Sequence, residues 1–168
     1  ERIQTFDMEI IFVGTGTSRG VPVLDQVLED HPWIQNPKNW RTRSSIHIVM
    51  DGVRIQVDAG PEFRIQCLQN RIPSVDLFIL THGHADHIMG MDDLRAFNNQ
   101  EELGSKRLPI YASEEGLERI AVLYPYALRE DIPLGYPSFS LHLMPDLLTC
   151  PKGGQIRSTR LPHGEIEV

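Results

Sequence analysis

The sequence has few of the features that mark secreted, membrane-spanning or disulfide-rich proteins. It contains only two cysteines, Cys67 and Cys150, with no CxxC or CxxH neighbour. Such isolated cysteines are typical of reduced thiols rather than of a disulfide or zinc framework. The longest apolar runs span only a few residues, whereas crossing a bilayer takes roughly 20. Residues 1–7 lack the apolar segment of a signal peptide. We therefore expect a cytoplasmic chain with no membrane partner.

The chain is also short of positive charge and of aromatic residues. Its 16 lysines and arginines are outnumbered by 23 aspartates and glutamates, which gives a net charge of −7. A field of this sign repels polyanions and attracts cations. The four tyrosines are scattered, without the interleaved basic residues that form a stacking platform for single-stranded nucleic acid. Nucleic acid therefore stays open as a partner but is not favoured.

What is present fits one globular domain over residues 1–168. This length lies within the usual range of about 100–200 residues per domain. The 13 glycines and 12 prolines indicate many loops. The chain begins at Glu1, and Met8 directly precedes the first strand-like run, so we expect residues 1–7 to be an extension or a tag remnant. The alternating pattern at 165–168 indicates the start of a strand, so we expect a fold that is incomplete at its C-terminus.

The apolar runs predict strands that alternate with helices. The dipeptide Asp51-Gly52 predicts a hairpin, because both central residues of such a turn take a positive φ. Strands are expected at 8–13, 46–50, 53–57, 75–80, 108–111, 138–143 and 155–161. Helices are expected at 61–69, at 89–97 and after Ser113, and a long surface loop at 22–40. This order indicates a layered sheet of the α/β or α+β class.

Three histidines and an aspartate fall within six positions directly after a buried strand. In an extended segment, residues two apart project to one side, so His82 and His84 can present their imidazoles to one cation. Asp86 and His87 then become neighbouring donors for a second cation as the chain turns into a helix. Imidazole and carboxylate suit zinc, manganese or iron, and the absence of thiolates argues against a structural zinc site. The segment predicts a two-metal hydrolytic centre rather than a polar loop with chance histidines.

These residues resemble the HxHxDH signature of the metallo-β-lactamase-fold hydrolases at every position. The resemblance extends to Asp58, which matches the aspartate of the family's first motif, and to His163, which matches the histidine of its third. The segment 15–22 is similar to the branch that holds the cyclic-phosphate phosphodiesterases of phosphonate metabolism, near the tRNA 3′-end processing endonucleases. The fold implied is an αββα sandwich.

The resemblance also implies a role for each matching residue. His82, His84 and His163 would bind one divalent ion, while Asp86 and His87 would bind the other, with zinc or manganese favoured and iron as a third option. Asp86 would in addition aim the attacking hydroxide, so it is the expected catalytic residue. Asp58 would orient a metal-binding imidazole through the free ring N–H. The bridging aspartate and the last histidine of the family have no counterpart up to Val168.

The candidate substrate-binding residues are Arg41, Arg43, Ser44 and Arg95, which could bind an anionic group. For the first three, a solvated loop face is an equal interpretation; for Arg95, pairing with Asp92 or Asp93 is the alternative. His47 and His142 alternate with apolar residues and are expected to lie on strand faces. The loop 22–40 lacks the cysteines that hold an extra structural zinc in relatives, so we expect none there.

The leading hypothesis is a dinuclear-metal phosphodiesterase that acts on a small anionic substrate, either a cyclic phosphodiester or a nucleotide-like one. Two divalent ions activate a shared water and neutralise charge on phosphoryl oxygens. The alternatives are an RNA-processing endonuclease, a thioesterase or glyoxalase-II-like hydrolase, and a non-catalytic, metal-binding fragment. A homodimer stays open.

Overall fold

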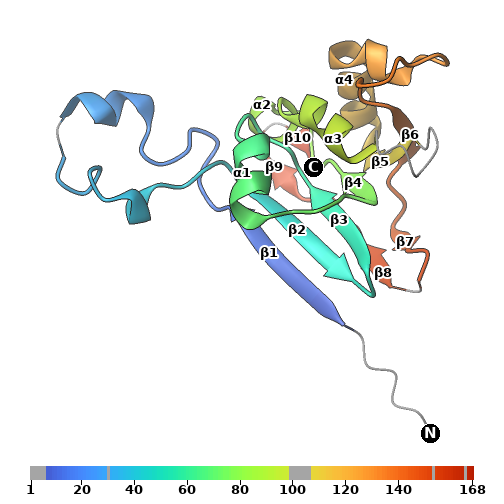
Figure 1. Ribbon diagram of the computed structural model, residues 1–168, viewed down its shortest axis with the longest axis horizontal. Helices are drawn as coiled ribbons and strands as arrows, with labels where there is room; N and C mark the ends of the chain where they lie inside the picture. The colour runs from blue at the N-terminus through green and yellow to red at the C-terminus, as the bar shows by residue number, and fades with distance from the viewer. Residues whose placement is uncertain (1–6, 30, 99–106, 153, 165) are drawn as a thin grey trace, which may run out of the picture.

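The computed structural model describes residues 7–29, 31–98, 107–152, 154–164 and 166–168. Its centre is a six-stranded sheet in which the strands follow the chain order from β1 to β6 (Figure 1). The strands are β1 (Met8–Gly14), β2 (Ser45–Met50), β3 (Val53–Val57), β4 (Leu77–Ile79), β5 (Leu108–Ala112) and β6 (Phe139–Leu143). The first three strands pair antiparallel, and β3 to β6 pair parallel. The mixed sheet confirms the predicted fold class.

The hairpin between β2 and β3 forms where it was predicted. Asp51 and Gly52 have φ values of 50° and 75°, the left-handed backbone that the turn requires. The resulting register places Ile48 opposite Ile55 and His47 opposite Gln56. Alternate residues therefore face opposite sides of the sheet, which separates two apolar clusters.

The helices cover one face of the sheet and form the larger cluster. They are α1 (Phe63–Asn70), α2 (Ala85–Ile88), α3 (Arg95–Asn98) and α4 (Glu114–Leu123), with the short 3₁₀ helices η3 (Met91–Leu94) and η5 (Pro125–Leu128) between them. Phe63, Ile88 and Ile120 from the helices are fully buried with Phe78 and Ile110 from the sheet. Burying each such side chain contributes about 1.5–3 kcal/mol. Helix α4 begins at the predicted cap, since Ser113 Oγ accepts a hydrogen bond from the Gly116 amide.

The opposite face of the sheet is only partly covered. The hairpin of β7 (Leu147–Thr149) and β8 (Gln155–Arg157) packs Cys150 and Ile156 against Ile55 and Leu77. Farther along this face, the register continues to β1, where Phe12 is 69% exposed. Of the predicted αββα layers, the described residues thus form one helical layer, one large sheet and small two-stranded sheets. Among the helices of the described ranges, none is long and apolar enough to cross a bilayer.

Three predicted boundaries were wrong. The helix expected at 89–97 starts earlier and is divided into α2, η3 and α3, because Gly90 packs directly against the carbonyl of Gly60. The strand expected at 155–161 ends at Arg157, and β9 (Pro162–His163) pairs instead with β10 (Ile166–Glu167). The strand expected at 75–80 is limited to β4. Residues 1–6 and 165, on which two expectations about the chain ends depend, lie outside the described residues.

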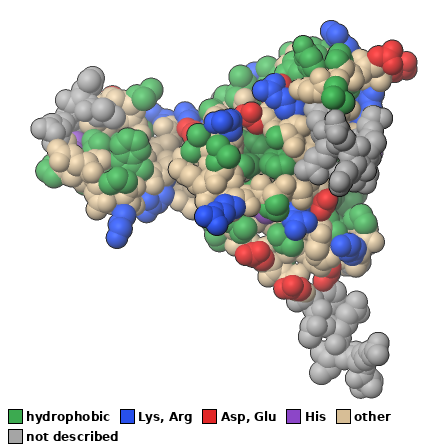
Figure 2. Space-filling view, in the orientation of Figure 1, with side chains coloured by type: hydrophobic (Ala, Val, Ile, Leu, Met, Phe, Trp, Pro, Cys, Tyr) green, Lys and Arg blue, Asp and Glu red, His purple; other side chains and the backbone are tan. Residues whose placement is uncertain are grey.

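The predicted surface loop at 22–40, called the arm below, extends from one side of the molecule (Figure 1) and carries η1 (Leu24–Glu29) and η2 (Pro37–Asn39). Isolated bridges at its base join Val21 to Arg41 and Gly16 to Arg43. The Trp40 indole donates a hydrogen bond to the Ile34 carbonyl at 2.7 Å. Figure 2 shows the arm as a lobe with hydrophobic and basic side chains on its surface.

Candidate metal centre

The site lies where the chain leaves β3 and β4, two parallel neighbours in the sheet. Because parallel strands end at the same edge, Asp58 after β3 meets the segment 81–88 after β4. The Asp58 amide donates to the Ile79 carbonyl at 2.9 Å, and the Ala59 amide donates to the His87 carbonyl at 2.7 Å. Asp58 has a φ of 60°, a conformation that Asp adopts more easily than most residues. Backbone hydrogen bonds thus fix the two segments to each other.

The carboxylate of Asp58 is buried and fully engaged. Its Oδ1 accepts a hydrogen bond from the Thr81 amide, and its Oδ2 accepts one from the Thr81 hydroxyl, both at 2.8 Å. Oδ2 also lies 2.7 Å from Nδ1 of His87. This contact fixes the ring of His87 and leaves its Nε2 facing Oδ2 of Asp86 at 3.1 Å. The geometry is that of a carboxylate that orients a ligand imidazole.

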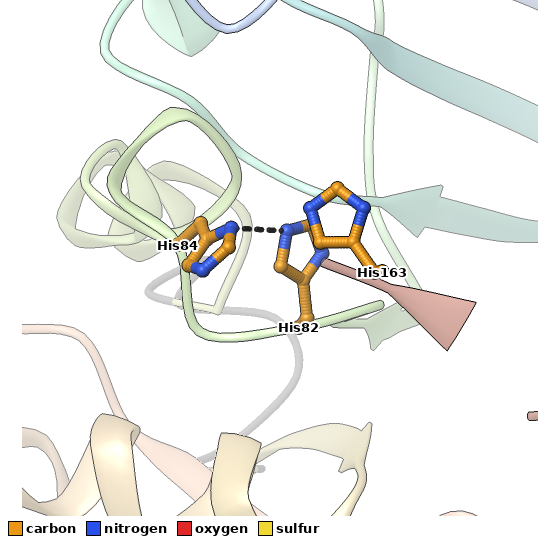
Figure 3. A group of neighbouring side chains, drawn as sticks. All are labelled: His82, His84 and His163. Atoms are coloured by element: carbon orange, nitrogen blue, oxygen red, sulfur yellow. Dashed lines mark hydrogen bonds between the residues drawn. The ribbon is translucent and has the colours of Figure 1, made fainter. Parts of the chain in front are cut away.

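The three matching histidines gather beside this pair. Their ligand atoms all lie within 4.8 Å of one another, and Nε2 of His82 is 3.0 Å from Nδ1 of His84. In Figure 3, His82 and His84 come from the segment after β4, and His163 approaches from β9. His82 is buried, whereas His84 and His163 are exposed. Two segments far apart in the sequence thus bring three imidazoles together.

His82 and His87, two histidines of the site, have opposite pKa shifts. Burial, together with His87 and His84, lowers the pKa of His82 to about 4. Burial also opposes protonation of His87, but the hydrogen bond and charge of Asp58, with Asp86, outweigh it and raise its pKa. His82 is therefore neutral at pH 7, and a neutral imidazole has a lone pair available for a metal ion.

The donor set fits a divalent ion. Three imidazole nitrogens within 4.8 Å of one another, with no thiolate among them, suit zinc or another borderline transition metal. The adjacent pair of Asp86 Oδ2 and His87 Nε2, 3.1 Å apart, supplies an oxygen and a nitrogen. The ring centroid of His87 is 4.2 Å from that of His82. The ligand roles, the catalytic role of Asp86 and the number of ions stay predictions.

Sequence reasoning missed three residues that build this geometry. Thr81 supplies both donors to Asp58. Gly60 faces the Asp86 carbonyl, 2.2 Å from where a Cβ would stand, and Gly90 faces the Gly60 carbonyl, 2.0 Å from its own would-be Cβ. Neither position can hold a side chain without moving backbone. In the sequence, a glycine shortly after Asp58 and another shortly after His87 could have indicated this close backbone contact.

The four substrate-binding candidates are engaged with other protein groups. The Arg43 guanidinium bonds to Glu62 and to the Ser18 carbonyl, and Ser44 Oγ donates to the Gly16 carbonyl at 2.9 Å. Arg41 donates to the carbonyls of Lys38 and Trp40, at the base of the arm. Arg95 pairs with Asp92 at 2.7 Å, which is the alternative raised from the sequence. Their roles in substrate binding stay predictions.

The two remaining strand histidines lie apart from the three-histidine group. His47 is buried in the sheet, with Nδ1 3.2 Å from Oε1 of Gln56. Burial lowers its pKa, and the hydrogen bond to Gln56 opposes this only in part. His142 is exposed, with Nε2 3.1 Å from the Ser140 hydroxyl.

Comparisons with known proteins identify the family and the fold. The sequence profile of the Beta-lactamase superfamily domain matches residues 53–167. A diphosphatase from the PhnP family has a similar structure, with a TM-score of 0.81 and 29% identity over 96% of this chain and 60% of that one. Zn²⁺-bound PqqB from Methylobacterium extorquens is more distant, with a TM-score of 0.60 and 18% identity over 83% of this chain and 47% of that one. Human tRNase Z, short form, has a TM-score of 0.52 and 19% identity over 80% of this chain and 44% of its own. The last two show the fold alone.

A curated relative is named for a different activity. The octanoyltransferase of Porphyromonas gingivalis is 33% identical over 166 residues, which cover 96% of this chain but 32% of that protein. The chain therefore spans about a third of this relative and 60% of the diphosphatase. The named activity is therefore said only of that longer protein, most of which this chain does not match.

Proposed function

Because the chain belongs to the Beta-lactamase superfamily, we propose that it is a metal-dependent hydrolase whose substrate is a small cyclic or nucleotide-like phosphodiester. The observation that carries this proposal is the convergence of His82, His84 and His163 within 4.8 Å, beside the Asp86–His87 pair. The similarity to a diphosphatase at a TM-score of 0.81 supports a phosphoryl substrate over a thioester or a lactam.

The site would hold two divalent ions, either zinc or manganese, with iron as a third option. His82, His84 and His163 would hold one, and Asp86 with His87 would hold the other. Bound ions of this kind lower the pKa of water and neutralise charge on phosphoryl oxygens.

Asp58 and Asp86 would orient a ligand imidazole and accept a proton in the proposed reaction. Asp58 keeps Nδ1 of His87 protonated through their 2.7 Å contact. The lone pair of this imidazole is therefore on Nε2, where it can bind a metal ion. Asp86, whose Oδ2 faces that nitrogen at 3.1 Å, has a carboxylate that can accept a proton from an attacking water. The exposed edges of His84 and His163 leave the substrate an approach from solvent.

The alternative within the same fold is an RNA-processing endonuclease. The net charge of −7 argues against a polyanionic substrate. Ionic strength separates the two, because RNA affinity falls steeply with salt. Cleavage of a simple chromogenic phosphodiester that persists at high salt supports the small-substrate proposal.

The test combines metal analysis with an activity assay. We expect about two ions per chain, and hydrolysis of bis(4-nitrophenyl) phosphate that is absent in His84→Ala. His142→Ala is the matched control, since it removes an exposed histidine outside the group, and it should keep both metal and activity. A folded protein that binds no divalent ion, or near-normal turnover by His84→Ala, would contradict the proposal.

A further inference from the structure

A groove of about 440 Å³ opens next to the three histidines. His84 belongs to both, since its Nδ1 lies 3.0 Å from Nε2 of His82 and the residue also lines the groove. The opposite wall is helix α4, which contributes Glu115, Glu118, Arg119 and Val122. A ligand in the groove would therefore touch the candidate metal centre on one side and α4 on the other.

The absence of a side chain at Gly83 leaves room for Arg119 in this position. A Cβ built on Gly83 would lie 3.2 Å from Cβ and 3.1 Å from Cγ of Arg119, closer than side chains ordinarily pack. The glycine between the two ligand histidines thus leaves a space that the stem of Arg119 fills. This contact ties the arginine of α4 to the HxH segment.

The guanidinium of Arg119 remains available to a ligand. Glu115 precedes it by four residues, a spacing that commonly gives an ion pair on a helix. Within the described part of the chain, however, no ion pair or hydrogen bond involves Arg119. Arg43 and Arg95 differ from it, since each pairs with a carboxylate. An exposed, unpaired guanidinium in a groove beside a phosphodiesterase centre is suited to bind a further anionic group.

We propose that Arg119 binds a second phosphate, carried on the sugar of a nucleotide-like substrate. This inference rests on the proposed function and narrows its substrate class. Arginine suits the role because its planar fork matches a phosphate with two hydrogen bonds. Val122, 71% exposed along the same groove, offers an apolar surface for a base.

A binding experiment tests the groove without relying on turnover. Calorimetry on the metal-loaded chain would compare thymidine 3′,5′-bisphosphate with thymidine 5′-phosphate, which lacks the second anion. We expect Arg119→Gln to weaken the bisphosphate by about 10-fold or more, in line with a lost charged hydrogen bond, and to change the monophosphate by no more than about twofold. Arg119→Lys should restore part of the difference, because it keeps the charge.

The matched control is Arg64→Gln, which removes an exposed arginine of α1 outside the groove. It should leave both affinities unchanged. Equal affinity of the native chain for the two ligands would overturn the proposal. The proposal would also be overturned if Arg119→Gln weakened the affinity for both ligands by the same factor.

An activity assay separates this inference from the proposed function. The 5′-(4-nitrophenyl phosphate) ester of thymidine would be compared with the same ester carrying a 3′-phosphate. In Arg119→Gln, KM for the 3′-phosphorylated ester should rise about 10-fold with kcat unchanged. If the native chain hydrolyses neither ester, the proposed phosphodiesterase function is wrong, and the calorimetric contrast still decides the groove. If both esters are cleaved but calorimetry shows no preference, the groove proposal is wrong and the function stands.

Discussion

Two regions supply the three-histidine group, and the fold supports them very differently. The segments around Asp58 and 81–90 are joined by a buried carboxylate, backbone hydrogen bonds and two glycine contacts. His163 stands on β9, an exposed two-residue strand. The hairpin that holds it is closed by a pair of hydrogen bonds between Leu161 and Val168. The first region is therefore fixed by the packed fold, whereas the second rests on a short exposed hairpin. We expect the main contribution of the second region to be the third imidazole of the proposed metal site.

Substitution of Asp58 should have the largest effect on stability. In Asp58→Ala, three donors lose their common acceptor, and alanine must take the left-handed backbone. We expect a loss of about 3 kcal/mol or more in the free energy of unfolding, measured in urea on metal-free protein. Asp76→Ala, which removes an exposed carboxylate that accepts from the Arg54 amide, should cost about 1 kcal/mol. Similar losses in the two variants would contradict the special role of Asp58.

His47, which lies outside both regions, should have an intermediate effect on stability, seen when the free energy of unfolding is followed with pH. Burial lowers the pKa of His47 below its usual 6.5, so below that pH the unfolded chain binds a proton that the folded chain resists. Stability should therefore fall as pH drops below about 6.5, with a slope from this one group of at most about 1.4 kcal/mol per pH unit. His47→Gln should flatten the curve between pH 7.5 and 5.5. An unchanged slope would show that His47 protonates freely in the folded chain.

Substitution of His163 should have the smallest effect on stability. Because the side chain is exposed, His163→Ala should change the free energy of unfolding of the metal-free chain by no more than about 0.5 kcal/mol. Zinc affinity should nevertheless fall by more than about 100-fold, since even outer partners of metal ligands are worth 10–100-fold. Competition with a chromogenic chelator measures this. Destabilisation as large as that of Asp58→Ala would remove the distinction between the two regions.

The sequence predicted what depends on neighbours along the chain. The Asp51-Gly52 hairpin, the Ser113 cap and the density of His82 to His87 are local patterns, and the first two formed as expected. The predicted fold class and family were confirmed by the sheet and by the matching profile.

What the sequence did not predict depends on contacts between distant segments. The division of the 89–97 helix follows from the approach of Gly90 to Gly60. The sequence spacing of Glu115 and Arg119 favours an ion pair, but these two described residues form none, and the arginine stem lies beside Gly83. Arg95 differs from Arg119, because it does form an ion pair with a nearby residue of the sequence, Asp92.

The origin of the histidines in two segments also has a consequence for biosynthesis. At elongation rates of about 5–20 residues per second, His163 leaves the ribosome roughly 4–16 seconds after His84. During that interval the emerging chain offers an ion only the paired imidazoles of His82 and His84, with Asp86 and His87 beside them. Arrival of His163 on β9 then completes the cluster. For the proposed metal site, the order of synthesis thus separates a stage with two paired imidazoles from the stage at which the third imidazole joins them.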